Sequence, residues 1–154
     1  MKTLEELMNL AYEFQCNAIN GSARDEVSMP YFFAENDKGE MFVYAIANWT
    51  SETKNTIRKG LRQHFREHNI IQYATASEAW RATYPKDVDL SQIDRPSEHP
   101  SREDCLICGV VHRDGRKLGR SARIVVADDN KRHTDPLDED PMESVGGFML
   151  SLLE

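Results

Sequence analysis

The chain has 154 residues, of which 40% are hydrophobic and 29% charged, as in an ordinary globular domain with one core. Its net charge of −7 argues against a general nucleic-acid binder, although residues 48–126 hold 14 basic and only 10 acidic side chains. No apolar run is long enough for a transmembrane helix, and the acidic N-terminus is unlike a signal peptide. We therefore expect one cytoplasmic domain spanning residues 1–154.

The first predicted element is a helix that begins after Thr3 and ends at Asn20-Gly21. Thr3 and Glu6 have the spacing of a capping box, in which each side chain accepts a hydrogen bond from the backbone N–H of the other residue. Apolar residues then recur every three or four positions, as expected for one buried helix face. They are Leu4, Leu7, Met8, Ala11, Phe14 and Ala18.

Two strands are predicted next, Met29–Ala34 and Met41–Ala47. Both are rich in aromatic and β-branched residues, and the segment between them contains the Asn, Asp and Gly that a hairpin loop needs. The second strand is apolar at consecutive positions, so both of its faces are apolar. We therefore expect it to be a central strand.

A second helix is predicted from a cap at Thr50 or Ser51 to about His68. Residues Ile70–Thr75 then return as a strand, which can continue as far as Trp80. Three prolines and several Asp and Ser residues make residues 84–102 a Pro-rich irregular loop.

The remaining chain is predicted to form a second hairpin and a closing strand. Its two strands are Cys105–Val111 and Lys117–Val126, and the Asp-Gly pair between them is a strong turn signal. Residues 127–144 are expected to be an acidic loop, followed by a last strand at Gly147–Leu153.

These elements follow one another in the order α-β-β-α-β-β-β-β. Because the strands come in hairpins, they favour an α+β fold with a largely antiparallel sheet of about five to six strands. We expect both helices to pack on one face of this sheet.

Part of the sequence resembles a group of known proteins. The residues concerned are Ser77-Glu78-Ala79-Trp80, the stretch Arg95-Pro96-Ser97-Glu98-His99-Pro100-Ser101-Arg102-Glu103 and the turn Asp114-Gly115-Arg116. They resemble a loose group of small uncharacterised proteins from bacterial, prophage and phage genomes. The resemblance covers about Ser77–Arg116 and implies a mobile-element or viral origin, which favours action on a host component. It implies no activity and no site residues.

Two short patterns could carry chemistry. His64, Glu67 and His68 form an H-x-x-E-H that would place two zinc ligands on one helix face, although the same histidines could border the packed face instead. Cys105 and Cys108 form a C-x-x-C within a predicted strand, where residues three apart point to opposite faces. We interpret these cysteines as buried side chains in a reduced protein. No catalytic residue and no cofactor is predicted, and the H-x-x-E-H is an alternative metal site.

Basic residues and one tryptophan are the candidate binding residues. The second helix carries basic side chains every four residues, which could contact phosphates or an acidic partner. More basic residues cluster around the second hairpin turn, and Trp80 could anchor an interface. The candidates are Lys54, Arg58, Arg62, Arg66, Trp80, Arg113, Arg116 and Lys117.

Segregated charge without a catalytic motif favours binding over chemistry. The main hypothesis is a non-enzymatic interaction protein that binds a host protein or a ribonucleoprotein complex, such as a defence system, and can inhibit it. One alternative is a small metal-dependent hydrolase that uses His64, Glu67 and His68. A second alternative is a nucleic-acid binder that uses the basic face of the second helix.

Overall fold

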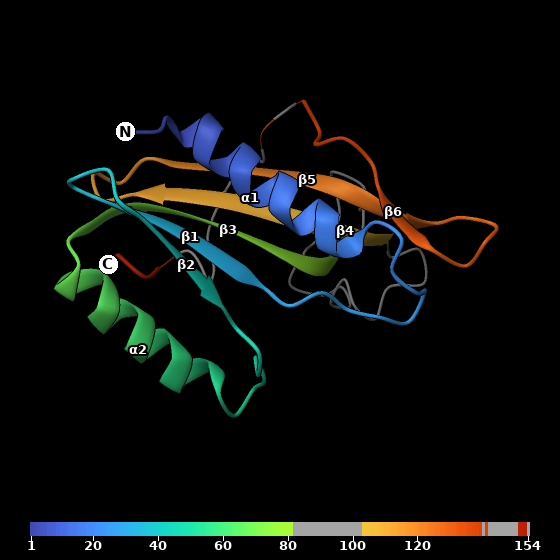
Figure 1. The fold of residues 1–154 in the computed structure, drawn as a ribbon, viewed down its shortest axis with the longest axis horizontal. Coiled ribbons are helices and arrows are strands. Elements are labelled where there is room, and N and C mark those ends of the chain that lie inside the picture. Colours follow the sequence, from blue (N-terminus) through green and yellow to red (C-terminus); the bar gives the residue numbers. More distant parts are fainter. Residues whose placement is uncertain (82–102, 140, 142–150, 154) are drawn as a thin grey trace, which may run out of the picture.

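The computed structural model describes residues 1–81, 103–139, 141 and 151–153. Two helices and six strands form an α+β fold (Figure 1). In chain order the elements are α1 (Leu4–Ile19), β1 (Tyr31–Asn36), β2 (Met41–Ala45), α2 (Lys54–Glu67), β3 (Ile70–Arg81), β4 (Glu103–His112), β5 (Lys117–Val126) and β6 (Arg132–Thr134). In this part of the chain, no helix is both long and apolar enough to span a membrane.

The six strands form one antiparallel sheet in the order β2-β1-β3-β4-β5-β6. The longest pairing joins β3 to β4, from Gln72 opposite His112 to Arg81 opposite Glu103. The predicted fold class, the antiparallel pairing and the number of strands are therefore confirmed. The predicted irregular loop at 84–102 lies entirely outside the described residues.

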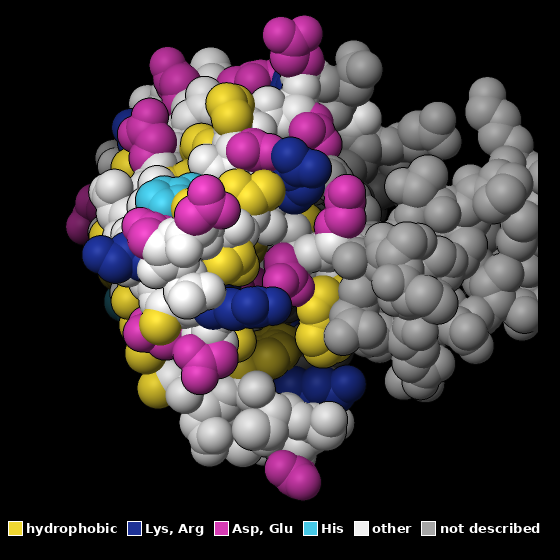
Figure 2. Space-filling model, turned by 90° about the vertical axis from the view of Figure 1, so that its right-hand side faces the viewer, with side chains coloured by type: hydrophobic (Ala, Val, Ile, Leu, Met, Phe, Trp, Pro, Cys, Tyr) yellow, Lys and Arg dark blue, Asp and Glu magenta, His cyan; other side chains and the backbone are white. Residues whose placement is uncertain are grey.

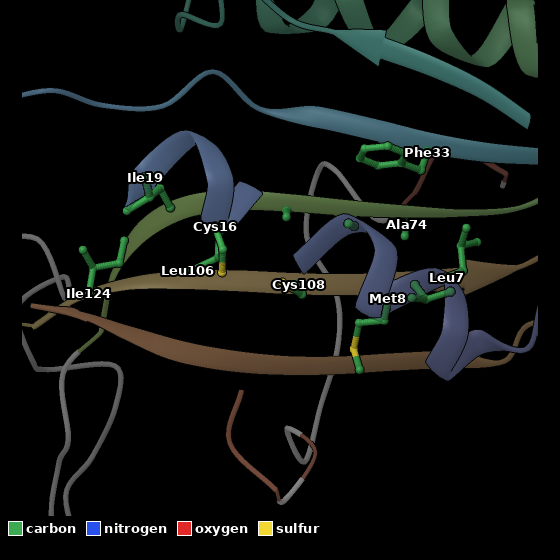
Figure 3. Close-up of a cluster of buried hydrophobic side chains, with 12 residues drawn as sticks. Leu7, Met8, Cys16, Ile19, Phe33, Ala74, Leu106, Cys108 and Ile124 are labelled. Carbon is green, nitrogen blue, oxygen red and sulfur yellow. The ribbon is translucent and has the colours of Figure 1, made fainter. Parts of the chain in front are cut away.

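Helix α1 packs on one face of the sheet. Its predicted capping box is present: the N–H of Glu6 donates to the Thr3 hydroxyl at 3.1 Å, and the N–H of Thr3 donates to Glu6 Oε2 at 2.8 Å. Figure 3 shows Leu7, Met8, Cys16 and Ile19 of the helix pointing toward the strands. They pack on side chains that include Phe33, Ala74, Leu106, Cys108 and Ile124. This cluster is the larger of the two hydrophobic cores.

Helix α2 packs on the opposite face, so the expectation that both helices share one face was wrong. On β1, Phe33 belongs to the α1 core, whereas its neighbours Phe32 and Ala34 pack with Leu61 and Phe65 of α2. Consecutive strand residues point to opposite faces of a sheet, so the two helices cover different faces. Strand β1 and the middle of β3 are therefore buried on both faces.

Three details of the sequence-based elements are corrected. The predicted central strand, Met41–Ala45, lies at the edge of the sheet, where it pairs with β1 alone among the described strands. Its Phe42 and Tyr44 pack with the α2 core, whereas Val43 on the other face is 55% exposed. The N-cap of α2 is Thr53 rather than Thr50 or Ser51, and its side chain makes no capping hydrogen bond.

The third correction concerns the last strand. A short strand, β6, pairs with β5 inside the segment predicted to be an acidic loop. Most of the predicted strand Gly147–Leu153 lies outside the described residues, and Leu152 and Leu153 form a turn.

A buried ion pair connects β6 to β3 near the C-terminal end of β3. Arg132 of β6 donates from both terminal nitrogens to the carboxylate of Glu78 on β3, and its Nε donates to Ser22 Oγ at 2.9 Å. The backbone N–H and the hydroxyl of Ser28 also donate to Glu78. The arginine and glutamate side chains are only 5% and 12% exposed. This network fastens the segment after α1 to two strands.

We predict that Arg132→Met lowers the free energy of unfolding by about 3 kcal/mol, because it leaves Glu78 as a buried carboxylate without its cation. Urea denaturation followed by circular dichroism measures the effect. The matched control is Arg123→Met, whose partner Asp135 is half-exposed; removal of this pair should cost no more than about 1 kcal/mol. Equal effects of the two substitutions would contradict the prediction.

Candidate functional site

Three arginine side chains from two elements line one small hollow, which we call the basic pocket. Arg62 and Arg66 come from α2, and Arg113 follows the end of β4. The hollow has a volume of about 110 Å³. Its apolar lining consists of Phe65, Leu152 and Leu153. The structure thus brings together one residue of the predicted turn cluster and two of the predicted helix ladder.

Hydrogen bonds to the start of β3 hold Arg113 beside α2. Its backbone N–H donates to the carbonyl of Ile71 at 2.7 Å, and its guanidinium donates to the carbonyl of Ile70 at 2.6 Å. Asn69, with φ of 54°, ends the helix region in a left-handed conformation just before this strand. The turn after β4 is therefore fastened to the strand that leaves α2, and both lie at the same end of the molecule (Figure 1).

A second hollow continues the positive surface along α2. It has a volume of about 360 Å³ and is lined by Asn55, Thr56, Arg58, Lys59 and Arg62. Arg62 therefore borders both hollows. Arg58 donates from Nε and Nη2 to Ser151 Oγ at 3.2 and 3.0 Å, which ties this guanidinium to the C-terminal part of the chain. Lys54, the remaining member of the predicted ladder, is half-buried at the first position of the helix.

The chemistry of the basic pocket suits an anion. Its three charges are guanidinium groups, which stay protonated at physiological pH and can donate two parallel hydrogen bonds to a carboxylate or a phosphate. Phe65 and Leu152 are 1% and 4% exposed, so the wall behind these charges is apolar. A low local dielectric strengthens hydrogen bonds to charged groups. The arrangement is therefore suited to recognising an acidic group.

The other two basic residues of the predicted turn cluster lie outside the pocket. Arg116 pairs with Asp114, with 2.8 Å between Nε and Oδ2, and both side chains are exposed. The backbone N–H of Arg116 donates to the Asp114 carboxylate and lowers the pKa of that group below its ordinary value. Lys117 is exposed at the start of β5. Arg116 thus stabilises the turn, whereas Arg113 contributes to the pocket.

The H-x-x-E-H histidines contact aromatic side chains of β2. The Tyr44 hydroxyl and His64 Nδ1 are hydrogen-bonded at 2.6 Å, and burial raises the pKa of Tyr44. The ring of His68 lies 4.8 Å from Phe42, measured between centroids. Glu67 accepts a hydrogen bond from the neighbouring helix residue Gln63. Within the described residues, no group of three His, Cys, Asp or Glu side chains is placed to hold a metal ion.

The cysteines are buried, as the C-x-x-C interpretation predicted. Cys105 and Cys108 are fully buried and Cys16 is 8% exposed; all three are free thiols. Burial, with a smaller contribution from Cys16, raises the pKa of the Cys108 thiol to about 12. A thiol with such a pKa is protonated at neutral pH and is a poor nucleophile.

Trp80 lies at the other end of the sheet from the basic pocket. It is 49% exposed and borders a separate hollow with Val27 and Asp104. A contact between Trp80 and a partner stays a prediction. The acidic residues around it were not predicted as site residues, because they come from distant parts of the sequence.

Comparison with protein families, with characterised proteins and with solved structures finds no significant match. The functional argument therefore depends on the geometry and chemistry of these residues.

We predict that the native thiols resist alkylation. With a pKa of about 12 for Cys108, only about one molecule in 10⁴ carries that thiolate at pH 8. Mass spectrometry after iodoacetamide treatment at pH 8 should therefore show slow modification of the folded protein and rapid modification of all three cysteines in urea. Rapid labelling of Cys108 without urea would contradict its burial against α1.

Proposed function

We propose that this protein is a non-enzymatic binding protein whose basic pocket engages an acidic segment of a host protein or of the protein part of a ribonucleoprotein complex. The observation that carries the proposal is the meeting of Arg62, Arg66 and Arg113 around one hollow with an apolar wall. Arg113 is hydrogen-bonded to the start of β3, the strand that follows α2, so the three charges are presented together rather than scattered over a solvated helix.

The shape of the pocket supports recognition of a side chain. A volume of about 110 Å³ accommodates a carboxylate-bearing side chain, and the leucines beside it offer contact to an apolar neighbour of that residue. Each hydrogen bond to a charged group contributes about 1.5–3 kcal/mol. The second hollow along α2 extends the positive surface by Arg58 and Lys59, which favours a partner with several acidic residues.

A protein partner is favoured over free nucleic acid. The whole chain carries a net charge of −7, which repels the continuous negative charge of a nucleic-acid backbone. An acidic peptide segment can instead place a few carboxylates in the pocket without contacting the acidic surfaces of the rest of this protein. The resemblance to small phage and prophage proteins makes a bacterial host the place to search for this partner, and a defence complex is one version of the hypothesis.

The experiment is affinity capture from nuclease-treated bacterial lysate, quantified by mass spectrometry. The test variant carries Arg66→Glu and Arg113→Glu, which reverse two of the three pocket charges. The matched control carries Lys38→Glu and Lys131→Glu, which make the same change of charge at exposed positions that line neither hollow of α2. We expect the test variant to capture the specific partner at least tenfold less than the wild type, since about 1.4 kcal/mol of lost interaction is sufficient.

Circular dichroism and urea denaturation of both variants establish that they are folded. Equal losses in the two variants would attribute binding to overall charge and contradict the role of the pocket. The wild-type capture is repeated from lysate without nuclease. A partner captured only from the untreated lysate would favour the nucleic-acid alternative instead.

A further inference from the structure

The α1 face of the sheet is longer than the helix that covers it. Helix α1 has 16 residues and is about 24 Å long, whereas the 12 residues of β3 extend over about 40 Å. The helix starts above Gln72, whose Nε2 donates to the carbonyl of Lys2 at 2.8 Å. It therefore covers about seven residues of β3. Trp80 lies beyond the end of the helix, which explains its exposure.

A hollow of about 270 Å³ occupies this end of the sheet. We call it the aromatic pocket, and it is bordered by Trp80, Val27, Asp25, Glu26 and Asp104. Val27 is 78% exposed, so two large apolar side chains face solvent at one place. Figure 2 views this end of the molecule and shows hydrophobic side chains in a recess that is bordered by both basic and acidic side chains.

The base of the aromatic pocket is electrically balanced and held in place. Glu78 and Arg132 also line the hollow, but they neutralise one another in the buried ion pair, and Ser28 donates two hydrogen bonds to the same carboxylate. These groups form a fixed polar wall. The pocket is thus built on a rigid part of the molecule.

The rim that remains is acidic. Asp25, Glu26 and Asp104 contribute three negative charges, and Arg24 contributes one positive charge. Asp104 lies directly opposite Trp80 in the β3–β4 pairing, so its carboxylate and the indole stand on the same face of the sheet. An indole face attracts cations through its quadrupole, and a neighbouring carboxylate adds a Coulombic attraction.

We propose that the aromatic pocket binds an arginine side chain of a protein partner, with the guanidinium stacked on Trp80 and hydrogen-bonded to Asp104 or to the acidic residues of the segment after α1. A guanidinium is planar and less strongly hydrated than an ammonium group, so it can stack on an indole while its edges donate to carboxylates. Its aliphatic stem contacts Val27. This site is distinct from the basic pocket at the other end of the sheet.

The experiment is a titration followed through the two tryptophan indole N–H signals in ¹H–¹⁵N spectra. The probe is a blocked pentapeptide with one arginine between glycines, and the matched control peptide has citrulline, which is isosteric and uncharged. We expect a saturable shift of the Trp80 signal with Kd on the order of 1 mM at low salt. Trp49, the other tryptophan, lies before α2 and serves as an internal control.

Asp104→Asn should weaken binding at least tenfold, whereas Asp129→Asn at an exposed turn should leave it unchanged. If Asp104→Asn alters the spectrum of the free protein broadly, the salt dependence of wild-type binding replaces it as the test of charge. An equal response to the citrulline peptide would overturn the proposal. Tighter binding of tetramethylammonium than of the arginine peptide would also overturn it, because a small-molecule ammonium site would then be indicated.

The basic pocket and the aromatic pocket share no lining residue. The shift of the Trp80 signal therefore tests the aromatic pocket independently of the capture experiment with Arg66→Glu and Arg113→Glu.

Discussion

The antiparallel ladder between β3 and β4 positions both candidate sites. Because the ladder runs from Gln72 opposite His112 to Arg81 opposite Glu103, the end of β4 meets the beginning of β3, just after α2. Arg113 is thereby delivered to the helix arginines. The same antiparallel pairing places the beginning of β4 beside the end of β3, where Asp104 faces Trp80. A single register thus determines which residues gather at each end of the sheet.

The sequence was most informative where local physics decides the structure. The capping box at Thr3, the Asp-Gly turn after Asp114 and the helical spacing of apolar residues depend on neighbours a few positions away, and the corresponding elements are present. The face on which each helix packs depends on distant contacts. Strand β1 is buried at five successive positions, because both of its faces are covered. Its sequence therefore lacks the alternation of apolar and polar residues that would indicate one buried face and one solvent-exposed face.

The same reason explains how much of each candidate site could be predicted. Arg62 and Arg66 were recognisable from their spacing on one helix, but their approach to Arg113 requires the β3–β4 register. The aromatic pocket was less accessible, because Trp80 and Asp104 belong to different strands and their acidic neighbours follow α1. Arg132 gave a misleading signal: within an acidic stretch it resembled a loop charge, yet it is 4% exposed and forms the ion pair with Glu78.

The separation of the two pockets has a consequence for binding. The ten paired positions of the ladder place its ends about 30 Å apart, and the linings of the two pockets differ in the sign of their net charge. Two complementary patches at that distance orient an approaching partner more strictly than either patch alone, because rotating the partner by half a turn would bring like charges together. Both pockets are also attached to the ladder, by the bonds of Arg113 to β3 and by the Glu78–Arg132 pair. Their spacing is consequently rigid, and little conformational entropy is lost when a partner contacts both.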